Sequence, residues 1–279
     1  MSILVPLGIA DSYGAGFEFS PQNLQYNTLR KYVKHPKYEI GNGRYTDDTQ
    51  MAAALAEHLI EKKPINSIDF AQSFLDAHNR DPRDGYSKRV KQALVTAKDG
   101  EDLIKILSPN KSNGNGACMR SAVISFVKDE QTVLHIAAEQ ALATHDSVEG
   151  VQSAQAIALA GWALRNNKCD RFGLIDYLHE HWIRVERTGN PGEGAHTVWV
   201  SILALCTPKK GSTLSEIMRT AVSFGGDTDT VAAIAVGLGT QAKDIVQTVP
   251  KILFEGFEKG EYGFNYLAKL DIGLETLNL

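Results

Sequence analysis

Two short acidic clusters could carry chemistry in this chain, although they lie near opposite ends of the sequence. The first is Thr46-Asp47-Asp48-Thr49 and the second is Asp227-Thr228-Asp229-Thr230, and each opens into an apolar, alanine-rich run. If the fold brings them together, four carboxylates share one pocket, and that density of negative charge requires a cation. Oxygen ligands without His or Cys select magnesium, manganese or calcium over zinc, and such a site can hold two ions.

Helix capping is the alternative explanation for each cluster taken alone, because Asp and Thr are preferred at helix N-termini. A cap needs one side-chain oxygen, whereas every residue of both clusters supplies one. We therefore favour a metal site. Helical spacing predicts that Asp227 and Thr230 share one face while Asp229 turns away from Asp227, so that Asp227 or Asp229 could bridge two ions.

Three further motifs could belong to the same site. Small residues between Gly8 and Gly16 predict a tightly packed helix that ends near Glu18, which is either a surface acid or an acid at the rim of the metal site. The loop 112–120 is rich in glycine and leads into an apolar segment, which suits either an anion site or an ordinary helix entry. His145 lies between two predicted helices and is a turn residue unless it faces the same pocket.

The elements that must position these residues are helical, because apolar residues recur at helical spacing and period-two alternation is scarce. We expect an all-α, compact multi-helix fold, organised as one domain over residues 1–279. Long or turn-rich loops are expected at 20–45, 79–86, 108–116 and 187–194. Helices are predicted at 48–62, 66–78, 86–98, 117–127, 130–143, 146–165, 194–206, 213–223, 229–240 and 248–257.

Composition and charge limit the binding partners and the cellular compartment expected for the protein. The formal net charge is −4 and the pI is about 6.1, which gives no electrostatic footprint for general nucleic-acid or membrane-surface binding. Three widely spaced cysteines without a CxxC pair argue against disulfides and zinc. The apolar start of the chain meets Asp11 at once and does not resemble a signal peptide. We expect a cytoplasmic, monomeric protein.

Taken in order from Gly8 to about Gly239, these motifs resemble the ADP-ribosylglycohydrolase family, which includes dinitrogenase-reductase-activating glycohydrolase and the ADP-ribosylarginine and ADP-ribosylserine hydrolases. The two acidic clusters are the specific part of the resemblance, and the glycine-rich loops are less so. The other matching segments are Gly8-Ile9-Ala10-Asp11 through Glu18, Asp81-Pro82-Arg83, Gly114-Asn115-Gly116 with Met119-Arg120, Thr144-His145, and His196-Thr197.

The resemblance implies an all-α fold and a binuclear magnesium or manganese centre. Its metal ligands, carried over by position, are Thr46, Asp47, Asp48, Asp227, Asp229 and Thr230. Glu18, Asp47 and Asp229 are the expected catalytic residues. The expected substrate contacts are Ser112, Gly114, Asn115 and Gly116 at the diphosphate and distal ribose, His145, Asn113 at the place of an aromatic near the adenine in some relatives, and Asp84 as the extra acid of arginine-specific members.

The implied function is hydrolysis of the glycosidic bond that joins ADP-ribose to a protein side chain, with arginine favoured over serine. Glu18 would act as general acid or base, and the surrounding carboxylates would stabilise an oxocarbenium-like transition state. The partner would be an ADP-ribosylated protein or another ADP-ribose conjugate. Two alternatives remain open: a two-metal phosphohydrolase acting on a nucleotide-like substrate, and an inactive module that binds ADP-ribose.

Overall fold

The computed structural model describes residues 2–183, 185, 187 and 189–277. Within these residues every regular element is a helix, which confirms the all-α prediction. The α-helices are α1 (Leu4–Gly14), α2 (Asp47–Ile60), α3 (Ser67–Arg80), α4 (Lys88–Thr96), α5 (Gly100–Leu107), α6 (Glu130–Leu142), α7 (Val148–Arg165), α8 (Leu174–Glu180), α9 (Gly194–Cys206), α10 (Leu214–Ser223), α11 (Thr228–Gly239), α12 (Lys251–Gly256) and α13 (Phe264–Glu275). Short 3₁₀ helices are η1 (Ala15–Phe17), η2 (Pro21–Tyr26), η3 (Asn115–Ala117), η4 (Ser121–Phe126) and η5 (Arg171–Gly173).

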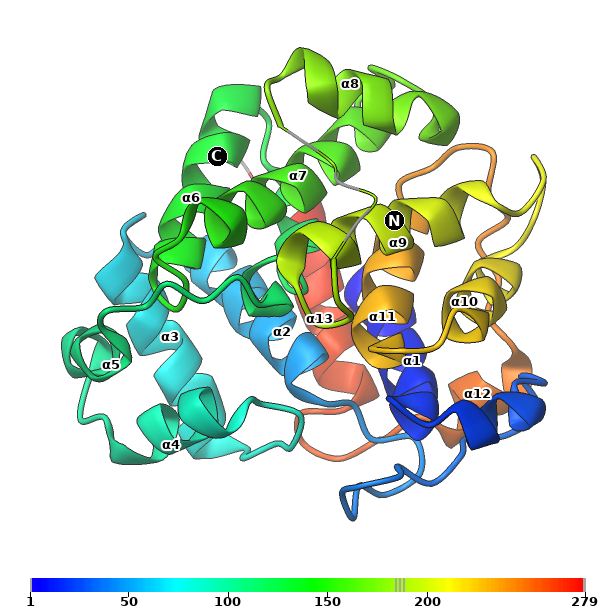
Figure 1. Cartoon of the computed structure of the whole chain (residues 1–279), viewed down its shortest axis with the longest axis horizontal. Helices are drawn as coiled ribbons and strands as arrows, with labels where there is room; N and C mark the ends of the chain where they lie inside the picture. Colours follow the sequence, from blue (N-terminus) through cyan, green and yellow to red (C-terminus); the bar gives the residue numbers. More distant parts are fainter. Residues whose placement is uncertain (1, 184, 186, 188, 278–279) are drawn as a thin grey trace.

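Helices α1 and α11 pack against each other in the middle of the molecule, although they come from opposite ends of the sequence (Figure 1). Every residue of α11 is buried, as expected for a helix that is apolar all round. The two helices approach closely at Gly14, where a Cβ would lie 2.5 Å from the backbone oxygen of Thr228. This contact requires glycine and places the start of α11 beside the end of α1.

The first turn of α1 is capped by a residue of α13. Asp271 accepts hydrogen bonds from the backbone N–H groups of Ile3 and Leu4 at 2.8 Å and of Val5 at 3.2 Å. A helix N-terminus leaves such donors unpaired, so a buried carboxylate from another helix satisfies them. This contact joins α1 to α13, which lie far apart in the sequence.

The structure corrects two predicted helices. The segment predicted as an α-helix at 117–127 contains the 3₁₀ helix η4 instead, and Ser121 Oγ there donates to Ala117 O at 2.8 Å. A short, fully buried apolar run does not distinguish the two helix types. The helix predicted at 248–257 is shorter, because Pro250 stands at its N-cap and α12 begins at Lys251. Helices α5, α8 and α13 were not predicted.

Much of the long connection before α2 is anchored to the rest of the molecule. Tyr32 is buried and donates a hydrogen bond to the backbone oxygen of Leu253 at 2.8 Å. The backbone oxygen of Gly43 accepts the N–H of Glu258 at 3.0 Å. Among the helices that the structure describes, none has both the length and the apolar character needed to cross a lipid bilayer.

Candidate active site

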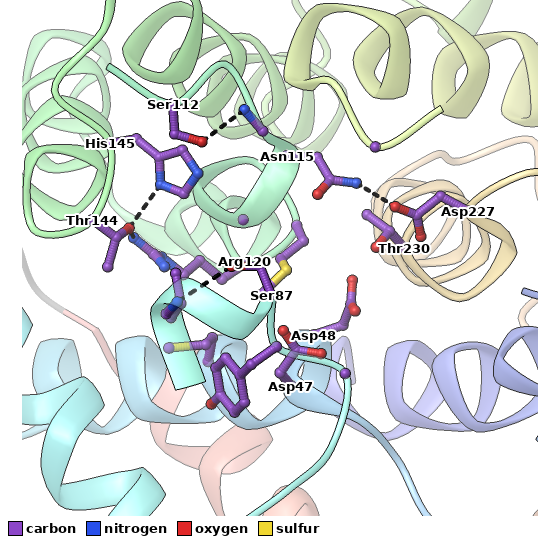
Figure 2. A pocket seen from close by; sticks show the side chains of 18 of the residues that line it. Asp47, Asp48, Ser87, Ser112, Asn115, Arg120, Thr144, His145, Asp227 and Thr230 are labelled. Atoms are coloured by element: carbon purple, nitrogen blue, oxygen red, sulfur yellow. Dashed lines mark hydrogen bonds between the residues drawn. The ribbon is translucent and has the colours of Figure 1, made fainter. Parts of the chain in front are cut away.

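A cavity of about 420 Å³ lies where the N-termini of α2 and α11 meet the loops before α4 and η3. Figure 2 shows Asp47 and Asp48 of α2 and Asp227, the residue before α11, around this space, with His145 and Ser112 on another side of it. The residues that line the cavity include Glu18, Asp47, Asp48, Tyr86, Ser112, Gly114, Asn115, Gly116, Arg120, Thr144, His145, Asp227, Asp229 and Thr230. The fold therefore brings together the two acidic clusters, Glu18, the glycine-rich loop and His145.

The first acidic cluster is positioned by Asp11, a completely buried residue of α1. The backbone N–H groups of Thr46 and Thr49 donate to the Asp11 carboxylate at 3.1 Å, and the hydroxyls of both threonines donate to it as well. Asp11 thus caps α2 from a neighbouring helix, and Thr46 makes no side-chain cap of its own. Because the cap is supplied in this way, Asp47 and Asp48 are left to face the cavity.

The second acidic cluster follows a turn at Gly225 and Gly226, whose φ angles of 69° and 74° favour glycine. Carboxylate oxygens of Glu18, Asp227 and Asp229 lie within 4.8 Å of one another. The expectation that Asp229 turns away from Asp227 is therefore wrong. Asp227 is the N-cap residue with φ −82° and ψ 75°, so its side chain does not follow helical spacing.

Burial and mutual repulsion disfavour the charged form of these acids. Burial, followed by the neighbouring carboxylates, raises the pKa of Asp47, Asp48 and Asp229 well above the ordinary value. The buried Oδ1 atom of Asp48 has no hydrogen-bond partner. An orphaned carboxylate oxygen beside other converging carboxylates fits a hard divalent cation, which would satisfy the oxygen and offset the repulsion.

The remaining predicted ligands and contacts occupy different positions. Thr230 lines the cavity, whereas Thr46 is buried behind it and donates to Asp11. Asp84 does not line the cavity: its carboxylate pairs with Lys91, and its backbone oxygen accepts the N–H of Asp47 at 3.1 Å. Asn113 is exposed and also lies outside the lining, with its backbone oxygen accepting Gly194 N–H at 2.8 Å.

Glycines allow the cavity wall to pass close to the acids and to His145. Gly85 has a φ of 117°, and a Cβ there would lie 1.8 Å from Asp47 Oδ1. A Cβ at Gly116 would lie 3.0 Å from Cε1 of His145. Asn115 ties the loop to the second cluster, since its Nδ2 donates to Asp227 Oδ2 at 2.8 Å (Figure 2).

His145 is held by a buried chain of hydrogen bonds. Arg120 donates to the backbone oxygen of Gln140 at 2.7 Å and to Thr144 Oγ1 at 2.8 Å, and its guanidinium lies over the ring of Phe74. Thr144 Oγ1 lies 2.9 Å from His145 Nδ1. Arg120 can only donate, so it does not accept the Thr144 hydroxyl proton. Nδ1 of His145 can accept that proton, and this arrangement, in which every donor of the network has an acceptor, puts the His145 proton on Nε2.

The charge states of Arg120 and His145 agree with this direction of the hydrogen bonds. Burial lowers the pKa of Arg120 to about 9, so the guanidinium stays charged near neutral pH. Burial, together with the Arg120 charge, lowers the pKa of His145 to about 3. His145 is therefore a neutral imidazole whose Nε2–H is available as a hydrogen-bond donor.

Sequence reasoning did not assign a role to Asp11 or Tyr86. Asp11 could have been found as the lone acid inside an otherwise apolar helix, since a buried charge needs partners. Tyr86 is buried at the cavity and donates to Gln50 Oε1 at 2.6 Å. No pattern in the sequence indicates that contact, because it joins the loop before α4 to α2 through tertiary packing.

The fold is all-α, and the site combines converging carboxylates with a glycine-rich loop. The profile of the family described as ADP-ribosylglycohydrolase matches residues 2–240, and the chain belongs to this family. The family predicted from the motifs is thereby confirmed. A solved structure titled "ADP-ribosylglycohydrolase-related protein complex" has the same fold, with a TM-score of 0.74 at 20% identity over 100% of this chain and 97% of that chain.

Curated relatives share more of the sequence than this solved structure does, but several match over only part of their length. ADP-ribosylhydrolase ARH3 of Xenopus tropicalis is 31% identical over 193 residues, which cover 64% of this chain and 53% of the frog protein. ARH3 of Mus musculus is 26% identical over 248 residues, covering 68% of this chain and 67% of the mouse protein. The match therefore spans about half the length of the frog relative. An uncharacterized protein of Archaeoglobus fulgidus is 26% identical over 96% of this chain and 94% of its own length.

Proposed function

We propose that this protein is a metal-dependent hydrolase that releases ADP-ribose from a modified protein side chain, with arginine favoured over serine. The observation that carries the proposal is the meeting of Glu18, Asp227 and Asp229 with the α2 acids in one cavity. The same cavity is lined by a glycine-rich loop and a neutral histidine. We propose that the protein works as a single-domain monomer in the cytoplasm; its three unpaired cysteines support the reducing compartment.

The donor set suits two magnesium or manganese ions. The residues proposed to hold them are Thr46, Asp47, Asp48, Asp227, Asp229 and Thr230. Thr46 lies behind the cavity lining and donates its hydroxyl proton to Asp11, so only the lone pairs of its oxygen are available to an ion. When bound, the ions would hold the hydroxyls of the ribose and lower the pKa of a water molecule. The orphaned Oδ1 of Asp48 and the raised pKa of Asp229 support this assignment, because both features are relieved by nearby positive charge.

The loop 112–116 and His145 are proposed to bind the diphosphate. Nε2 of His145 lies 3.5 Å from the position of a Cβ at Gly114, so its N–H opens onto the loop that would carry the anion. A neutral donor and backbone N–H groups bind a diphosphate without a further buried charge. Ser112 Oγ lies 3.2 Å from Gly114 N and fixes the turn at this point.

The chemistry that the residues support is hydrolysis at the anomeric carbon. Water adds its oxygen to that carbon, the bond to the side-chain nitrogen or oxygen breaks, and the leaving group takes a proton. Glu18 is the proposed acid or base for these proton transfers, and Asp47 and Asp229 stabilise the developing positive charge. An acidic end of the cavity also suits a cationic guanidinium better than a neutral serine, which supports arginine as the first choice.

Incubation with arginine-linked and serine-linked ADP-ribosylated proteins, in magnesium or in EDTA, tests the proposal. The expected product is free ADP-ribose, formed from the arginine-linked protein and lost in EDTA. Release of AMP would instead identify a phosphohydrolase. Binding of ADP-ribose without turnover of either substrate would identify a binding module, and faster release from the serine-linked protein would reverse the proposed linkage.

A further inference from the structure

Glu18 is held between two segments that are distant in sequence. Its neighbour Phe19 donates its backbone N–H to Gly226 O at 2.8 Å, which ties this turn to the second acidic cluster. On the other side, a Cβ at Gly16 would lie 2.4 Å from Val33 O, so the long connection before α2 lies directly on η1. The backbone of Glu18 is thus fixed, while its side chain is 22% exposed at the cavity.

The side chain of Glu18 is contacted by His35, a residue of that long connection. His35 Nε2 lies 2.9 Å from Glu18 Oε2, and the histidine side chain is 2% exposed. The other ring nitrogen, Nδ1, accepts the backbone N–H groups of Lys37 at 3.0 Å and Tyr38 at 2.9 Å. The His35 ring also packs against Tyr38, with ring centroids 4.9 Å apart.

These contacts determine where the His35 proton lies. Two backbone donors point at Nδ1, so Nδ1 must be the acceptor and the ring proton is on Nε2. Nε2–H therefore donates to Glu18 Oε2. The direction of this bond follows from the turn at residues 35–38 and needs no assumption about the charge of either residue.

We propose that His35 is a positioning residue, which fixes one carboxylate oxygen of Glu18 and leaves the other for the water or leaving group. The inference rests on the proposed catalytic role of Glu18. A glutamate at the edge of a cavity has several rotamers, and a single buried donor selects one of them. The turn at residues 35–38 holds Nδ1 and so fixes the His35 ring, and the fixed ring in turn orients the Glu18 carboxylate.

Two substitutions of His35 separate its bond to Glu18 from its bonds to the backbone of Lys37 and Tyr38. In His35→Asn the side-chain oxygen can still accept the N–H groups of Lys37 and Tyr38, but the side chain is too short to reach Glu18. In His35→Gln the amide nitrogen takes the place of Nε2 and can still donate to Glu18, while the turn loses its acceptor. Lys34→Ala changes an exposed residue of the same segment and serves as the control.

We expect His35→Asn to lower kcat about 10- to 100-fold with KM changed less than about threefold. His35→Gln should retain more of kcat than His35→Asn although its Tm falls further, and Lys34→Ala should match the wild type. Glu18→Gln and the double variant with His35→Asn should be equally impaired, because both remove the same oriented group. A wild-type kcat in His35→Asn, or equal losses in the Asn and Gln variants, would overturn the inference.

A readout without turnover keeps the inference separate from the proposed function. Nitrogen-15 NMR of the wild-type protein should show His35 with a protonated Nε2 and an unprotonated Nδ1, whether or not ADP-ribose is released. Failure of the wild type to release ADP-ribose would count against the proposed function alone. A His35 ring protonated on Nδ1 would overturn the positioning role, whatever the activity.

Discussion

Asp11 Oδ2 on α1 accepts the backbone N–H of Thr49 on α2 at 3.1 Å, and through this bond one helix caps another. Asp11→Ala would leave buried N–H and hydroxyl groups of Thr46 and Thr49 without an acceptor. We expect the free energy of unfolding to fall by about 2–4 kcal/mol. Urea denaturation in EDTA measures this loss, and Asp11→Asn should lose less, because its amide oxygen still accepts. Equal stability of the alanine variant and the wild type would refute the cap.

The close approach of Gly85 to Asp47 gives a second prediction. Gly85→Ala would force the Asp47 carboxylate out of its position, since the new Cβ would lie 1.8 Å from Oδ1. Gly211→Ala is the matched control, because Gly211 has a φ of 80° with nothing within 4 Å of the new Cβ. Because both positions have a positive φ, alanine should strain the backbone of each variant by about 1 kcal/mol. Manganese affinity, measured by calorimetry, should fall at least about tenfold in Gly85→Ala and stay unchanged in Gly211→Ala.

Asp48 is the acid with an orphaned oxygen, and its removal tests the metal site directly. Asp48→Asn should abolish binding of at least one manganese ion, because an amide supplies a weaker ligand and no charge. Asp76→Asn changes an exposed acid of α3 outside the cavity lining and should bind like the wild type. Calorimetric titration gives the number of ions bound. An undiminished number in Asp48→Asn would exclude Asp48 as a ligand.

The raised pKa values predict a pH-dependent effect of metal on stability. Burial raises the pKa of Asp11 from 3.8 to about 6, and those of Asp47 and Asp229 are also raised. A carboxyl with a raised folded-state pKa stabilises the fold below about pH 4, and that contribution is lost as pH rises through about 6.

Divalent cations should therefore raise Tm more at pH 7.5 than at pH 5, since they compete with protons for Asp47 and Asp229, the two proposed ligands among these acids. At a metal concentration 100-fold above Kd the gain is about 2.7 kcal/mol per independent site. Thermal unfolding at both pH values, with and without manganese, measures the effect. A larger shift at pH 5 would contradict it.

His145 should not titrate across the physiological range. Burial and Arg120 lower its pKa from 6.5 to about 3, so its stabilising contribution is present above about pH 6.5 and lost as pH falls toward 3. NMR of the His145 ring between pH 8 and 5 should show a neutral imidazole throughout. In urea-unfolded protein the same ring should titrate near 6.5. A titration near 6.5 in the folded protein would show that the ring is not buried as described.

The sequence was most informative where residue type alone carries the signal. Asp47 and Asp229 stand in clusters with more oxygen ligands than capping requires, so their shared pocket could be anticipated. The role of Asp11 could not be anticipated, because it depends on which helix packs beside α2. The orientation of Asp229 was mispredicted, since Asp227 lies outside the helix whose spacing was applied to it. The 3₁₀ segment at 121–126 was mispredicted because burial hides its period.

Two contacts on α1 have a consequence for the order in which the site is made. Asp11 fixes the start of α2, and Gly14, three residues later and about 4.5 Å further along the axis, fixes the start of α11. During synthesis the ribosome delivers α1 and α2 early and α11 much later. A nascent chain that stops before Gly225 carries Glu18, Asp47 and Asp48 but lacks Asp227 and Asp229. The proposed metal centre is therefore complete only after the distant helix α11 has closed onto α1.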